Sequence, residues 1–406
     1  MTPSIRTPSS PPASDTRFRP APERDLPIRR PAPPEPHDTL RQDSTAAAGR
    51  PLSGKPSTSP PYAAVRMKSE GEGMEPLRIG ILGAARIAGR AIAEPARLTG
   101  ARLVAVAARD TERAEAFAAE HGVERVHASY EDVINDPEVE AIYNPLANGL
   151  HGPWNLRAIA AGKHVLTEKP SASNAAEAAQ VRDAAREAGV VLMEGFHYVF
   201  HPVTKRIQEL LAKGELGELQ HVEATMVMGP PADEDPRWSL ALAGGAVMDV
   251  GCYALHAQRM LAPWGGGQPK LVSARAGERK RLPGVDEWLN ADLEFPNGAT
   301  GAVRTSMAAE ELDFSLKVVG TRGEAFAPSF VLPHQDDRVI VTTKEDHWVE
   351  QLGRKSSYTY QLEAFTAHLR NGTPLPIDAD DAVATMELID ACYQDAGLQP
   401  RPVTQI

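Results

Sequence analysis

Hydrophobic and polar positions alternate regularly from residue 77 to residue 195. Short apolar runs typical of buried strands alternate with Ala-rich amphipathic stretches typical of helices, several of which end at a glycine. Strands that alternate with helices form βαβ units, so the pattern predicts an α/β domain over 76–195 with the doubly wound parallel sheet of a Rossmann fold. Ligands of such sheets bind at the carboxyl ends of the strands. The apolar runs are 77–82, 103–108, 141–146, 164–169 and 190–195.

The pattern changes after residue 195. A predicted helix at 201–213 is followed by runs in which apolar and polar residues alternate, separated by turn sequences such as PNG and TRG. This alternation predicts a C-terminal α+β domain over 196–406 with a mostly antiparallel open sheet, one face of which is covered by a helix. Two further helices near the carboxyl end are expected to pack back on the first domain. The alternating runs include LQHVEATMVM, LVSARAGERK, WLNADLEF, ATGAVRTSM and FSLKVVGT.

The start of the chain has a different composition. The first 66 residues hold 15 of the 35 prolines and almost no periodic apolar positions. Such a segment buries too little apolar surface to offset the entropy of ordering, so we expect a disordered Pro-rich tail over 1–75. Two interpretations stay open: the tail is a genuine part of the protein, or translation starts at Met67. The pair Arg29 and Arg30 is not followed by an apolar run, which argues against an export signal.

Composition narrows the class of protein further. The formal net charge is −11, and Lys and Arg are not clustered, so no nucleic-acid partner is expected. No uncharged apolar run approaches the roughly 18 to 20 residues of a membrane span, so no membrane partner is expected either. The two cysteines, Cys252 and Cys392, have neither scaffold nor metal-site spacing, which favours a cytoplasmic protein. The histidines show no metal-ligand spacing, and we expect no metal.

The turn after the first strand resembles a dinucleotide-binding fingerprint. From Gly83 the sequence reads GAARIAG, so only the first of the three fingerprint glycines is in place. Gly83 is suited to the tight turn after the strand. Ala85 at the second position is small enough for backbone N–H groups around Arg86 and Ile87 to approach a pyrophosphate. The alternative is an ordinary strand–helix turn without a ligand.

The second strand bears on the choice of cofactor. Arg109 and Asp110 follow the run at 103–108, where this fold contacts the adenosine ribose. An acidic residue there accepts a hydrogen bond from the 2′-hydroxyl of NAD, whereas an arginine suits the 2′-phosphate of NADP. Because Arg109 comes first, NADP is favoured and NAD is the alternative. Arg109 can also be interpreted as a solvated arginine next to a helix N-cap formed by Asp110 or Thr111.

Three residues are suited to the oxidation of an alcohol, which needs a hydride acceptor and a group that takes the hydroxyl proton. Lys169 follows a strand and is expected beside the nicotinamide, and Tyr253 can approach from the second domain. An ammonium about 4 Å from a phenol, at an effective dielectric near 20, contributes roughly 4 kcal/mol. Lys169 is therefore expected to bring the pKa of Tyr253 from about 10 toward neutrality. Asp249, four residues before Tyr253, is expected to orient Lys169 or a substrate hydroxyl.

Three blocks of the sequence together resemble the Gfo/Idh/MocA oxidoreductases. The stretch AIYNPLANGLHGPWNLRAIAAGKHVLTEKP at 141–170 ends in the Glu-Lys-Pro hallmark of that family. MEGFHYVFHP at 193–202 and GGAVMDVGCY at 244–253 resemble its two later blocks. GAARIA, ARD and the tyrosine after DVGC are similar to the branch of dimeric dihydrodiol dehydrogenases, NADP-dependent D-xylose dehydrogenases and glucose–fructose oxidoreductase.

The resemblance implies an NAD(P)-dependent oxidoreductase in which Lys169 and Tyr253 are the catalytic pair. Many members of the family have a histidine at the position of Tyr253, and His256 stands where they have a second acid. His256 therefore stays open as a rival base or as a packed helix histidine. Asn148 and His151 are implied to line the nicotinamide–ribose side, and as an alternative they cap the helix that begins near residue 151.

The resemblance also implies the remaining contacts. Glu168 is implied to lie in the cofactor site, and the substrate site is implied to hold Phe196, Arg237, Trp238 and His256. The uncovered face of the second sheet is implied to form a homodimer. Together these observations predict an NADP-dependent dehydrogenase that acts on a CH–OH group of a small polyol, a sugar or a cyclic trans-diol. Two alternatives stay open: a related glycosidase or sugar oxidoreductase that keeps and recycles its cofactor, and a non-catalytic NADP-binding sensor.

Overall fold

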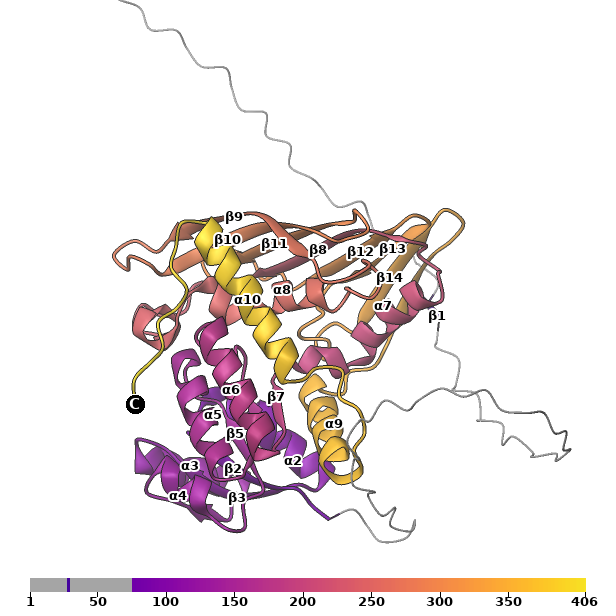
Figure 1. Ribbon diagram of the computed structural model, residues 1–406. Coiled ribbons are helices and arrows are strands. Elements are labelled where there is room, and N and C mark those ends of the chain that lie inside the picture. The colour runs from indigo at the N-terminus through magenta and orange to yellow at the C-terminus, as the bar shows by residue number, and fades with distance from the viewer. Residues whose placement is uncertain (1–27, 30–74) are drawn as a thin grey trace, which may run out of the picture.

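The computed structural model describes residues 28–29 and 75–406, which form two sheets with their helices (Figure 1). The prediction of a disordered tail over 1–75 lies outside the described residues except at these few positions. At Ile28–Arg29 the chain forms the short strand β1, which pairs in parallel with β15 (His347–Gln351). These two residues therefore form a strand within the segment 1–75, which the composition predicted to be disordered.

The first sheet has six parallel strands in the order β4-β3-β2-β5-β6-β7. From the central strand β2 the chain first adds β3 and β4 on one side and then β5, β6 and β7 on the other. The strand order therefore reverses at β2, and sheets of this kind bind ligands at such a reversal, beyond the carboxyl ends of the strands. Apart from the two-residue edge strand β4, the strands are short, mainly apolar and mostly buried, as parallel strands covered on both faces are. The doubly wound sheet predicted from the sequence is thus confirmed. The strands are β2 Arg78–Leu82, β3 Arg102–Ala107, β4 Arg125–Val126, β5 Ala141–Asn144, β6 His164–Thr167 and β7 Leu192–Glu194.

Local sequence signals begin and end the helices around this sheet. Asn174 caps α6 by accepting a hydrogen bond from the backbone N–H of Glu177, and Gly189 ends α6 in the left-handed conformation. The helix after the fingerprint contains a π-helical stretch, η1, of a kind that is frequent at functional sites. The helices are α1 Arg86–Ala88, η1 Gly89–Ala93, α2 Glu94–Thr99, α3 Thr111–His121, α4 Tyr130–Asn135, η2 Asn148–Leu150, α5 His151–Ala160 and α6 Ala175–Ala188.

The second sheet is open and has nine strands in the order β1-β15-β14-β13-β12-β8-β11-β10-β9. Its pairs are antiparallel apart from β8 with β11 and β1 with β15, which confirms the mostly antiparallel sheet. Leu289, Ala291 and Leu293 alternate with exposed polar residues along β10, so one face is buried. The remaining strands are β8 Leu219–Val227, β9 Lys270–Glu278, β10 Asp286–Glu294, β11 Thr300–Ser306, β12 Leu316–Gly320, β13 Gly323–Ala327 and β14 Arg338–Thr343.

Helices cover the face of this sheet that is turned toward the first sheet (Figure 1). Helix α8 packs on β8 and β11, α7 on β14, and α10 on β9. Helix α10 also packs on α6, and α9 packs on α2, so both C-terminal helices contact the first half of the molecule. The elements are η3 His197–Phe200, α7 Pro202–Ala212, η4 Pro236–Trp238, η5 Leu240–Leu242, η6 Val247–Gly251, α8 Cys252–Arg259, α9 Ser357–Asn371 and α10 Ala379–Asp395.

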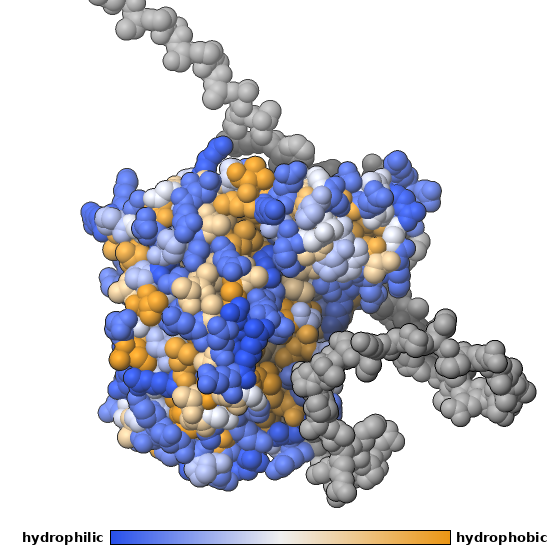
Figure 2. All heavy atoms as spheres, viewed as in Figure 1, coloured by the Kyte–Doolittle hydropathy of each residue, from blue (hydrophilic) through white to orange (hydrophobic). Residues whose placement is uncertain are grey.

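The segment Leu240–Arg259 lies at the centre of this arrangement. By length and composition it is apolar enough to cross a membrane, but 78% of its apolar window is buried inside the protein. It contains η6 and α8 and packs between the two sheets, so its apolar character is that of a core helix. The outer surface seen in Figure 2 is largely hydrophilic, with hydrophobic residues exposed in scattered patches.

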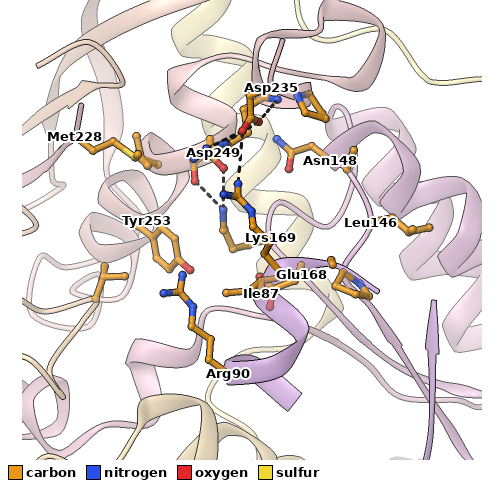
Figure 3. Close-up of a pocket in the computed structure, with 18 of the residues that line it drawn as sticks. Ile87, Arg90, Leu146, Asn148, Glu168, Lys169, Met228, Asp235, Asp249 and Tyr253 are labelled. Carbon is orange, nitrogen blue, oxygen red and sulfur yellow. Dashed lines mark hydrogen bonds and ion pairs between the residues drawn. The ribbon is translucent and has the colours of Figure 1, made fainter. Parts of the chain in front are cut away.

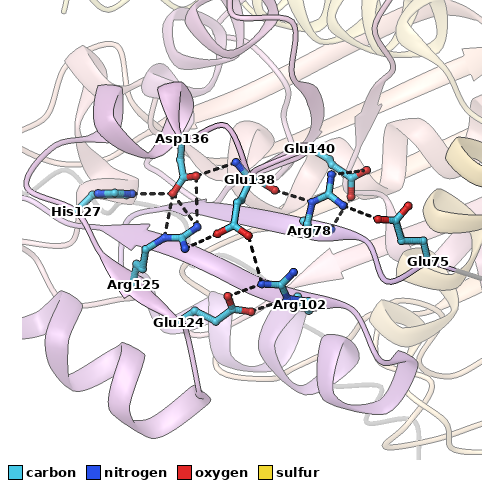
Figure 4. Close-up of polar contacts among 9 residues, drawn as sticks. All are labelled: Glu75, Arg78, Arg102, Glu124, Arg125, His127, Asp136, Glu138 and Glu140. Atoms are coloured by element: carbon cyan, nitrogen blue, oxygen red, sulfur yellow. Dashed lines mark hydrogen bonds and ion pairs between the residues drawn. The ribbon is translucent and has the colours of Figure 1, made fainter.

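Charged residues join the strands at the amino edge of the first sheet, opposite the ligand crevice. The first residue of β2, β3 and β4 is an arginine in each case. Each arginine pairs with acidic residues (Figure 4): Arg78 with Glu75 and Glu140, Arg102 with Glu124 and Glu138, and Arg125 with Asp136 and Glu138. These ion pairs connect neighbouring strands at the amino edge, on the side of the sheet opposite the ligand crevice.

Candidate active site

A cavity of about 850 Å³ opens where the carboxyl edge of the first sheet faces the helices of the second. Its walls come from the turn after β2, the loops after β5 and β6, the segment η6–α8, the strand β8 and the start of α9. Most of the predicted site residues that line it are drawn in Figure 3. Both π-helical segments of the described chain, η1 and η6, contribute to its wall.

The fingerprint turn forms one end of the cavity. Gly83 has a φ of +97° and donates its N–H to the carbonyl of Ala107 at 2.7 Å. A Cβ at this position would lie 2.9 Å from Cδ2 of Leu146, so the turn needs glycine for its conformation and for space. Ala85 is extended and precedes the first helical residue, Arg86. Ala85, Arg86 and Ile87 line the cavity, and the helix that starts there offers free N–H groups, so the turn fits a pyrophosphate.

The adenosine side of the site holds two arginines, Arg109 and Arg113, at the N-terminal end of α3. Asp110 caps α3 by accepting from the backbone N–H of Arg113 at 3.3 Å, which confirms its alternative interpretation as an N-cap. Arg109 is exposed and is not among the described residues that line the cavity. Arg113 instead donates from Nη2 to the carbonyl of Ala84 at 2.8 Å and lines the cavity beside the fingerprint. Sequence reasoning missed Arg113, although it follows Arg109 by one helical turn.

Asn148 and His151 both line the cavity, and neither caps α5, which has no side-chain cap. The Asn148 amide donates to the carbonyl of Ala243 at 3.4 Å. His151 is buried, with Nδ1 2.6 Å from the carbonyl of Pro170 and Nε2 2.8 Å from the carbonyl of Leu146. Burial lowers the pKa of His151 to about 4, so the ring is neutral at pH 7 and donates to one of these two carbonyls. His151 therefore holds the loop after β5 against the Glu-Lys-Pro segment.

Lys169 follows β6, points into the cavity and contacts Asp249 from the other half of the molecule (Figure 3). Its Nζ donates to the backbone carbonyl of Asp249 at 2.7 Å and lies 3.6 Å from Oδ1 of the same residue. Burial lowers the pKa of Lys169, but the Asp249 carboxylate and other nearby acids raise it, and the pKa stays above its usual value. Lys169 is therefore a fixed positive charge. Arg237 holds the other carboxylate oxygen of Asp249, with Nη1 3.4 Å from Oδ2.

Tyr253 lies in α8 with its hydroxyl 3.1 Å from Nε2 of His197. The Lys169 ammonium lies 5.2 Å from the centroid of the tyrosine ring and is bonded to the Asp249 carbonyl. Burial first, and then the neighbouring Tyr358 and Glu168, raise the pKa of Tyr253 well above its usual value. The expectation that Lys169 brings this pKa near neutrality is therefore not met in this arrangement. The reason is that burial of the phenol raises its pKa and that the acidic neighbours act in the same direction.

The spacing of Asp249 and Tyr253 was expected to be that of an α-helix. Asp249 instead lies in the π-helical stretch η6, and Tyr253 lies in the α-helix that continues it. A π-helical turn closes i to i+5 hydrogen bonds and is wider than an α-helical turn. Both residues still line the cavity.

Glu168 also lines the cavity, and it is buried. Its Oε1 accepts a hydrogen bond from the hydroxyl of Tyr143 at 2.8 Å. Burial raises the pKa of Glu168, although the Lys169 charge and the Tyr143 hydrogen bond act against this rise. A carboxyl group of this kind adds a polar wall next to Lys169.

Phe196 and His256 do not line the cavity, which corrects the expectation that they contact substrate. Their rings stack on each other with centroids 3.9 Å apart. Both nitrogens of His256 are bonded, Nδ1 to the Tyr198 hydroxyl at 2.7 Å and Nε2 to Oδ2 of Asp381 at 2.8 Å. His256 is fully buried and has no nitrogen directed at the cavity, so it is the packed histidine of the two interpretations.

Trp238 is likewise absent from the described cavity wall, although its neighbour Arg237 lines it. The Trp238 ring is only 2% exposed and lies under the guanidinium of Arg279, 4.0 Å from the ring centroid. Its indole N–H donates to the carbonyl of Pro231 at 3.4 Å. Trp238 therefore anchors the loop that carries Arg237.

Several cavity residues could not be identified from spacing. Among them are His197, Arg90, Tyr358 and Asp235. Asp235 accepts from Arg237 at 3.0 Å and lies 3.6 Å from Arg86, so it connects the two halves across the cavity. His197 stood within the quoted block MEGFHYVFHP, which was its only sequence signal. Within the described residues, no group of three or more His, Cys, Asp or Glu side chains is placed to hold a metal ion.

A Rossmann sheet whose glycine turn opens onto a cavity with a lysine, a tyrosine and a carboxylate defines an NAD(P)-binding oxidoreductase. Family models agree with this class. The model of the oxidoreductase family with an NAD-binding Rossmann fold matches residues 77–196, and that of the GFO/IDH/MocA C-terminal domain matches residues 204–326. The chain belongs to the Gfo/Idh/MocA oxidoreductase family, as the resemblance of the three sequence blocks implied.

Individual relatives are sugar and diol dehydrogenases. The chain is 36% identical over 323 residues to D-xylose 1-dehydrogenase (NADP(+)) 2 of Haloferax volcanii, a match that covers 79% of this chain and 97% of that enzyme. It is 35% identical to trans-1,2-dihydrobenzene-1,2-diol dehydrogenase of Xenopus laevis, over 60% of this chain and 72% of that enzyme. A 3-ketoreductase of Actinomadura kijaniata, solved with NADP and TDP-benzene, superposes with a TM-score of 0.72 at 27% identity, over 79% of this chain and 98% of that one.

Proposed function

We propose that this protein is an NADP-dependent dehydrogenase that interconverts a secondary alcohol and the corresponding carbonyl group of a sugar or cyclic trans-diol. The observation that carries the proposal is the convergence of Lys169, Asp249 and Tyr253 from two halves of the molecule on one cavity. When bound, NADP supplies the hydride acceptor or donor. The xylose and dihydrodiol dehydrogenases among the relatives support the same reaction class.

The fingerprint end of the cavity would hold the cofactor. The turn at Ala85, Arg86 and Ile87 suits the pyrophosphate, and Asn148 with Glu168 borders the stretch that leads to Lys169. Arg113, whose guanidinium is fixed at the fingerprint, is suited to the 2′-phosphate that distinguishes NADP from NAD. NADP is also the cofactor named for the Haloferax enzyme and for the ketoreductase structure.

The polar end of the cavity would carry out the proton transfer. Of the two tyrosines that line the cavity, Tyr253 and Tyr358, Tyr253 is the one proposed to exchange a proton with the substrate oxygen, because the Lys169 ammonium lies 5.2 Å from the centroid of its ring. Lys169 remains charged and would hold the substrate oxygen in place. Asp249 and Arg237 would fix Lys169 through the contacts described above.

The opposite wall of the cavity is apolar and bears on the substrate. It is formed by side chains at the end of β8 and directly after it, and by two loops of the second half: Met226, Met228, Leu312, Phe314, Val331 and Leu332. Arg237, Asp235 and Asp249 on the polar side are already paired with one another. A cavity with one apolar wall and few unpaired polar groups suits a ring with an apolar face. Of the two proposed substrate classes, this favours a cyclic trans-diol over a free sugar.

We further propose that the protein is a cytoplasmic homodimer that pairs through the second sheet. Among the described residues no helix covers the outer face of this sheet (Figure 1). Val272 on the edge strand β9 and Trp288 on the neighbouring strand β10 are 59% and 37% exposed. The buried free cysteines Cys252 and Cys392 suit a reducing compartment. Light scattering of the protein and of a Trp288→Glu variant tests the dimer, since a monomer in both would contradict it.

Turnover measured with defined substrates tests the reaction. The full chain is incubated with NADP or NAD and with trans-cyclohexane-1,2-diol, trans-1,2-dihydrobenzene-1,2-diol or D-xylose, and absorbance of the reduced nicotinamide is followed. We expect reduction of NADP by a diol and its loss in Tyr253→Phe. Absence of turnover with any substrate, despite tight binding of NADP, would contradict the proposal and favour a sensor. Cofactor that copurifies and stays bound through turnover would instead indicate a recycling enzyme.

A further inference from the structure

A hydrogen-bonded chain leads from Tyr253 away from the cavity into α9. The Tyr253 hydroxyl lies 3.1 Å from Nε2 of His197, and Nδ1 of His197 lies 2.8 Å from Oγ of Ser357. His197 and Ser357 are both fully buried, so water does not compete for either hydrogen bond. The chain therefore fixes the phenol of α8 to the first residue of another helix.

The tautomer of His197 decides how the Tyr253 hydroxyl is oriented. Burial and the positive charges of Lys169 and Arg90 lower the pKa of His197 well below its usual value, so the ring is neutral. One nitrogen of a neutral imidazole donates and the other accepts. If Nε2 carries the proton, it donates to the Tyr253 oxygen, and the O–H of Tyr253 is free to face the cavity. If Nδ1 carries it, Tyr253 donates to Nε2 and faces the cavity with lone pairs only.

The surroundings of Ser357 favour the first arrangement. Within residues 75–406 the Ser357 hydroxyl has His197 as its one hydrogen-bond partner. A hydroxyl that accepted from Nδ1 would leave its own hydrogen buried without an acceptor, at a cost of about 1–3 kcal/mol. Ser357 satisfies that hydrogen by donating to Nδ1. The hydrogen bond at Nδ1 then places the ring proton on Nε2, next to Tyr253.

We infer that His197 is a positioning residue: Ser357 donates to its Nδ1, its Nε2–H donates to the Tyr253 oxygen, and the Tyr253 proton is left facing the substrate. The inference rests on the proposed function, in which Tyr253 exchanges a proton with substrate. In carbonyl reduction the O–H bond of Tyr253 breaks, its proton joins the carbonyl oxygen, and the phenolate remains bonded to Nε2–H. In alcohol oxidation that phenolate takes the hydroxyl proton. A hydrogen bond to the charged form lowers the pKa, so His197 acts against the burial of Tyr253.

Other titratable and charged groups face the same rings. Around Tyr253 they come from the loop after β6 and from η6, α8, α9 and η1: Glu168, Lys169, Asp249, Cys252, Tyr358 and Arg90, the last of which points toward Tyr253 in Figure 3. Around His197 they are Lys169, Arg90, His201 and His334. All of them are retained in the variants below. A difference between variant and parent therefore reports the hydrogen bonds of His197.

The test compares pH profiles of alcohol oxidation in His197→Phe, Ser357→Ala and Ser357→Thr. Phenylalanine removes both hydrogen bonds but keeps a ring against Tyr358, whose centroid is 3.8 Å from that of His197. We expect kcat of His197→Phe to fall about 10- to 100-fold at neutral pH with KM nearly unchanged, and the rising limb to move about one to two pH units upward. Ser357→Ala should also move the rising limb of the pH profile upward, but by less. Ser357→Thr, which keeps a hydroxyl donor, should return the limb to its position in the parent.

The direction of the shift can overturn the inference. If Tyr253 instead donates to Nε2, His197 stabilises the neutral phenol, and His197→Phe moves the limb downward. That result, or an unchanged profile in both His197→Phe and Ser357→Ala, contradicts the inference. Tyr253→Phe separates it from the proposed function, because wild-type turnover in that variant would refute the role of Tyr253 itself.

The tautomer can also be read without activity. Nitrogen-15 spectra of the full chain labelled at its 12 histidines distinguish protonated from unprotonated ring nitrogens. The signals lost in His197→Phe, or shifted in Ser357→Ala where the first variant does not fold, identify His197. A protonated Nε2 with a bare Nδ1 is expected, and a protonated Nδ1 would overturn the inference.

Discussion

The Lys169 ammonium donates to the backbone carbonyl of Asp249 at 2.7 Å, and this bond joins the two halves of the molecule at the cavity. The carboxylate of Asp249 forms a second contact with the same ammonium, an ion pair in which Oδ1 lies 3.6 Å from Nζ of Lys169. The first contact depends on where the backbone of η6 runs, and the second depends on a side chain. Substitution at Asp249 can therefore remove the charge and leave the carbonyl in place.

Asp249→Asn should narrow the pH range of activity on its alkaline side. The Asp249 carboxylate raises the pKa of Lys169 against the effect of burial, so without it the pKa of Lys169 falls and the ammonium is lost at lower pH. Lys169→Met, which removes the charge at every pH, should lower kcat about 10²- to 10³-fold. Rates measured from pH 6 to 11 check both variants, because the pKa of Lys169 in the parent lies above its usual value. An alkaline limb in Asp249→Asn identical to that of the parent would contradict this role of the carboxylate.

Gly83→Ala should abolish cofactor binding and lower stability. The φ of +97° strains any L side chain by about 1–3 kcal/mol, and the new Cβ would lie 2.9 Å from Leu146. Gly100→Ala is the matched control, because Gly100 has a φ of +79° but nothing within 4 Å of its Cβ. Thermal midpoints should fall in both variants, and NADP titration should fail only in Gly83→Ala. Normal NADP affinity in Gly83→Ala would refute the role of this turn.

Arg113→Ala should weaken the binding of NADP about 10- to 100-fold and leave that of NAD nearly unchanged. A charge-assisted hydrogen bond to the 2′-phosphate accounts for that size of effect, and NAD lacks the phosphate. Arg109→Ala is the comparison, since Arg109, unlike Arg113, does not border the cavity. Fluorescence titration with both nucleotides checks the pair. A larger loss in Arg109→Ala than in Arg113→Ala would restore the assignment made from sequence.

The parallel sheet and the position of Lys169 could be predicted from sequence because both follow from local rules. Apolar runs that alternate with capped helices specify the sheet, and its topology brings the residues after β2, β5 and β6 to one edge. Gly83 was recognisable for the same reason, as a turn that directly follows a strand. These features depend on the order of strands and helices along the chain, and that order can be read from the sequence.

The rest of the site depends on packing between segments far apart in the chain. His197 meets Ser357 across 160 positions, and no periodicity relates them. Phe196 and His256 were expected at the substrate, but their stacking on each other takes both away from the cavity. The pKa of Tyr253 was misjudged because the sequence reasoning assumed an ammonium about 4 Å from the phenol and did not include the burial of the phenol, which raises the pKa.

The apolar wall predicts a substrate-dependent response to polar substitution. Met228→Gln keeps the length of the side chain but removes apolar contact, and each CH₂ group of substrate that loses burial costs about 0.8 kcal/mol. KM for trans-cyclohexane-1,2-diol should therefore rise about tenfold or less, whereas KM for D-xylose should stay unchanged or fall. Leu98→Gln, at an exposed position of α2 outside the cavity, is the control. Equal changes for diol and sugar would contradict the preference for a ring with an apolar face.

Asp136 should make the first sheet sensitive to acid. Its side chain is only 6% exposed and accepts from His127 at 3.0 Å, from Arg125 at 3.2 Å and from the backbone N–H of Glu138 at 2.9 Å. Burial raises the pKa of Asp136, but these hydrogen bonds lower it, and the net pKa in the folded protein is below the usual value. The resulting stability is complete above the unfolded pKa near 4 and is lost as the pH falls through the lower folded pKa.

Asp136→Asn should therefore lower the free energy of unfolding by about 1–3 kcal/mol at pH 7 and reduce its decline between pH 5 and pH 3. Asp183→Asn is the control, because Asp183 also has a lowered pKa, from Arg182, but is exposed, where screening makes such pairs weak. Urea unfolding at several pH values checks the comparison. Asp136 is distant from the cavity, so activity at pH 7 should persist in Asp136→Asn. If both variants showed the same pH dependence as the parent, the acid sensitivity would have to arise elsewhere, and the network at the amino edge would not contribute to it.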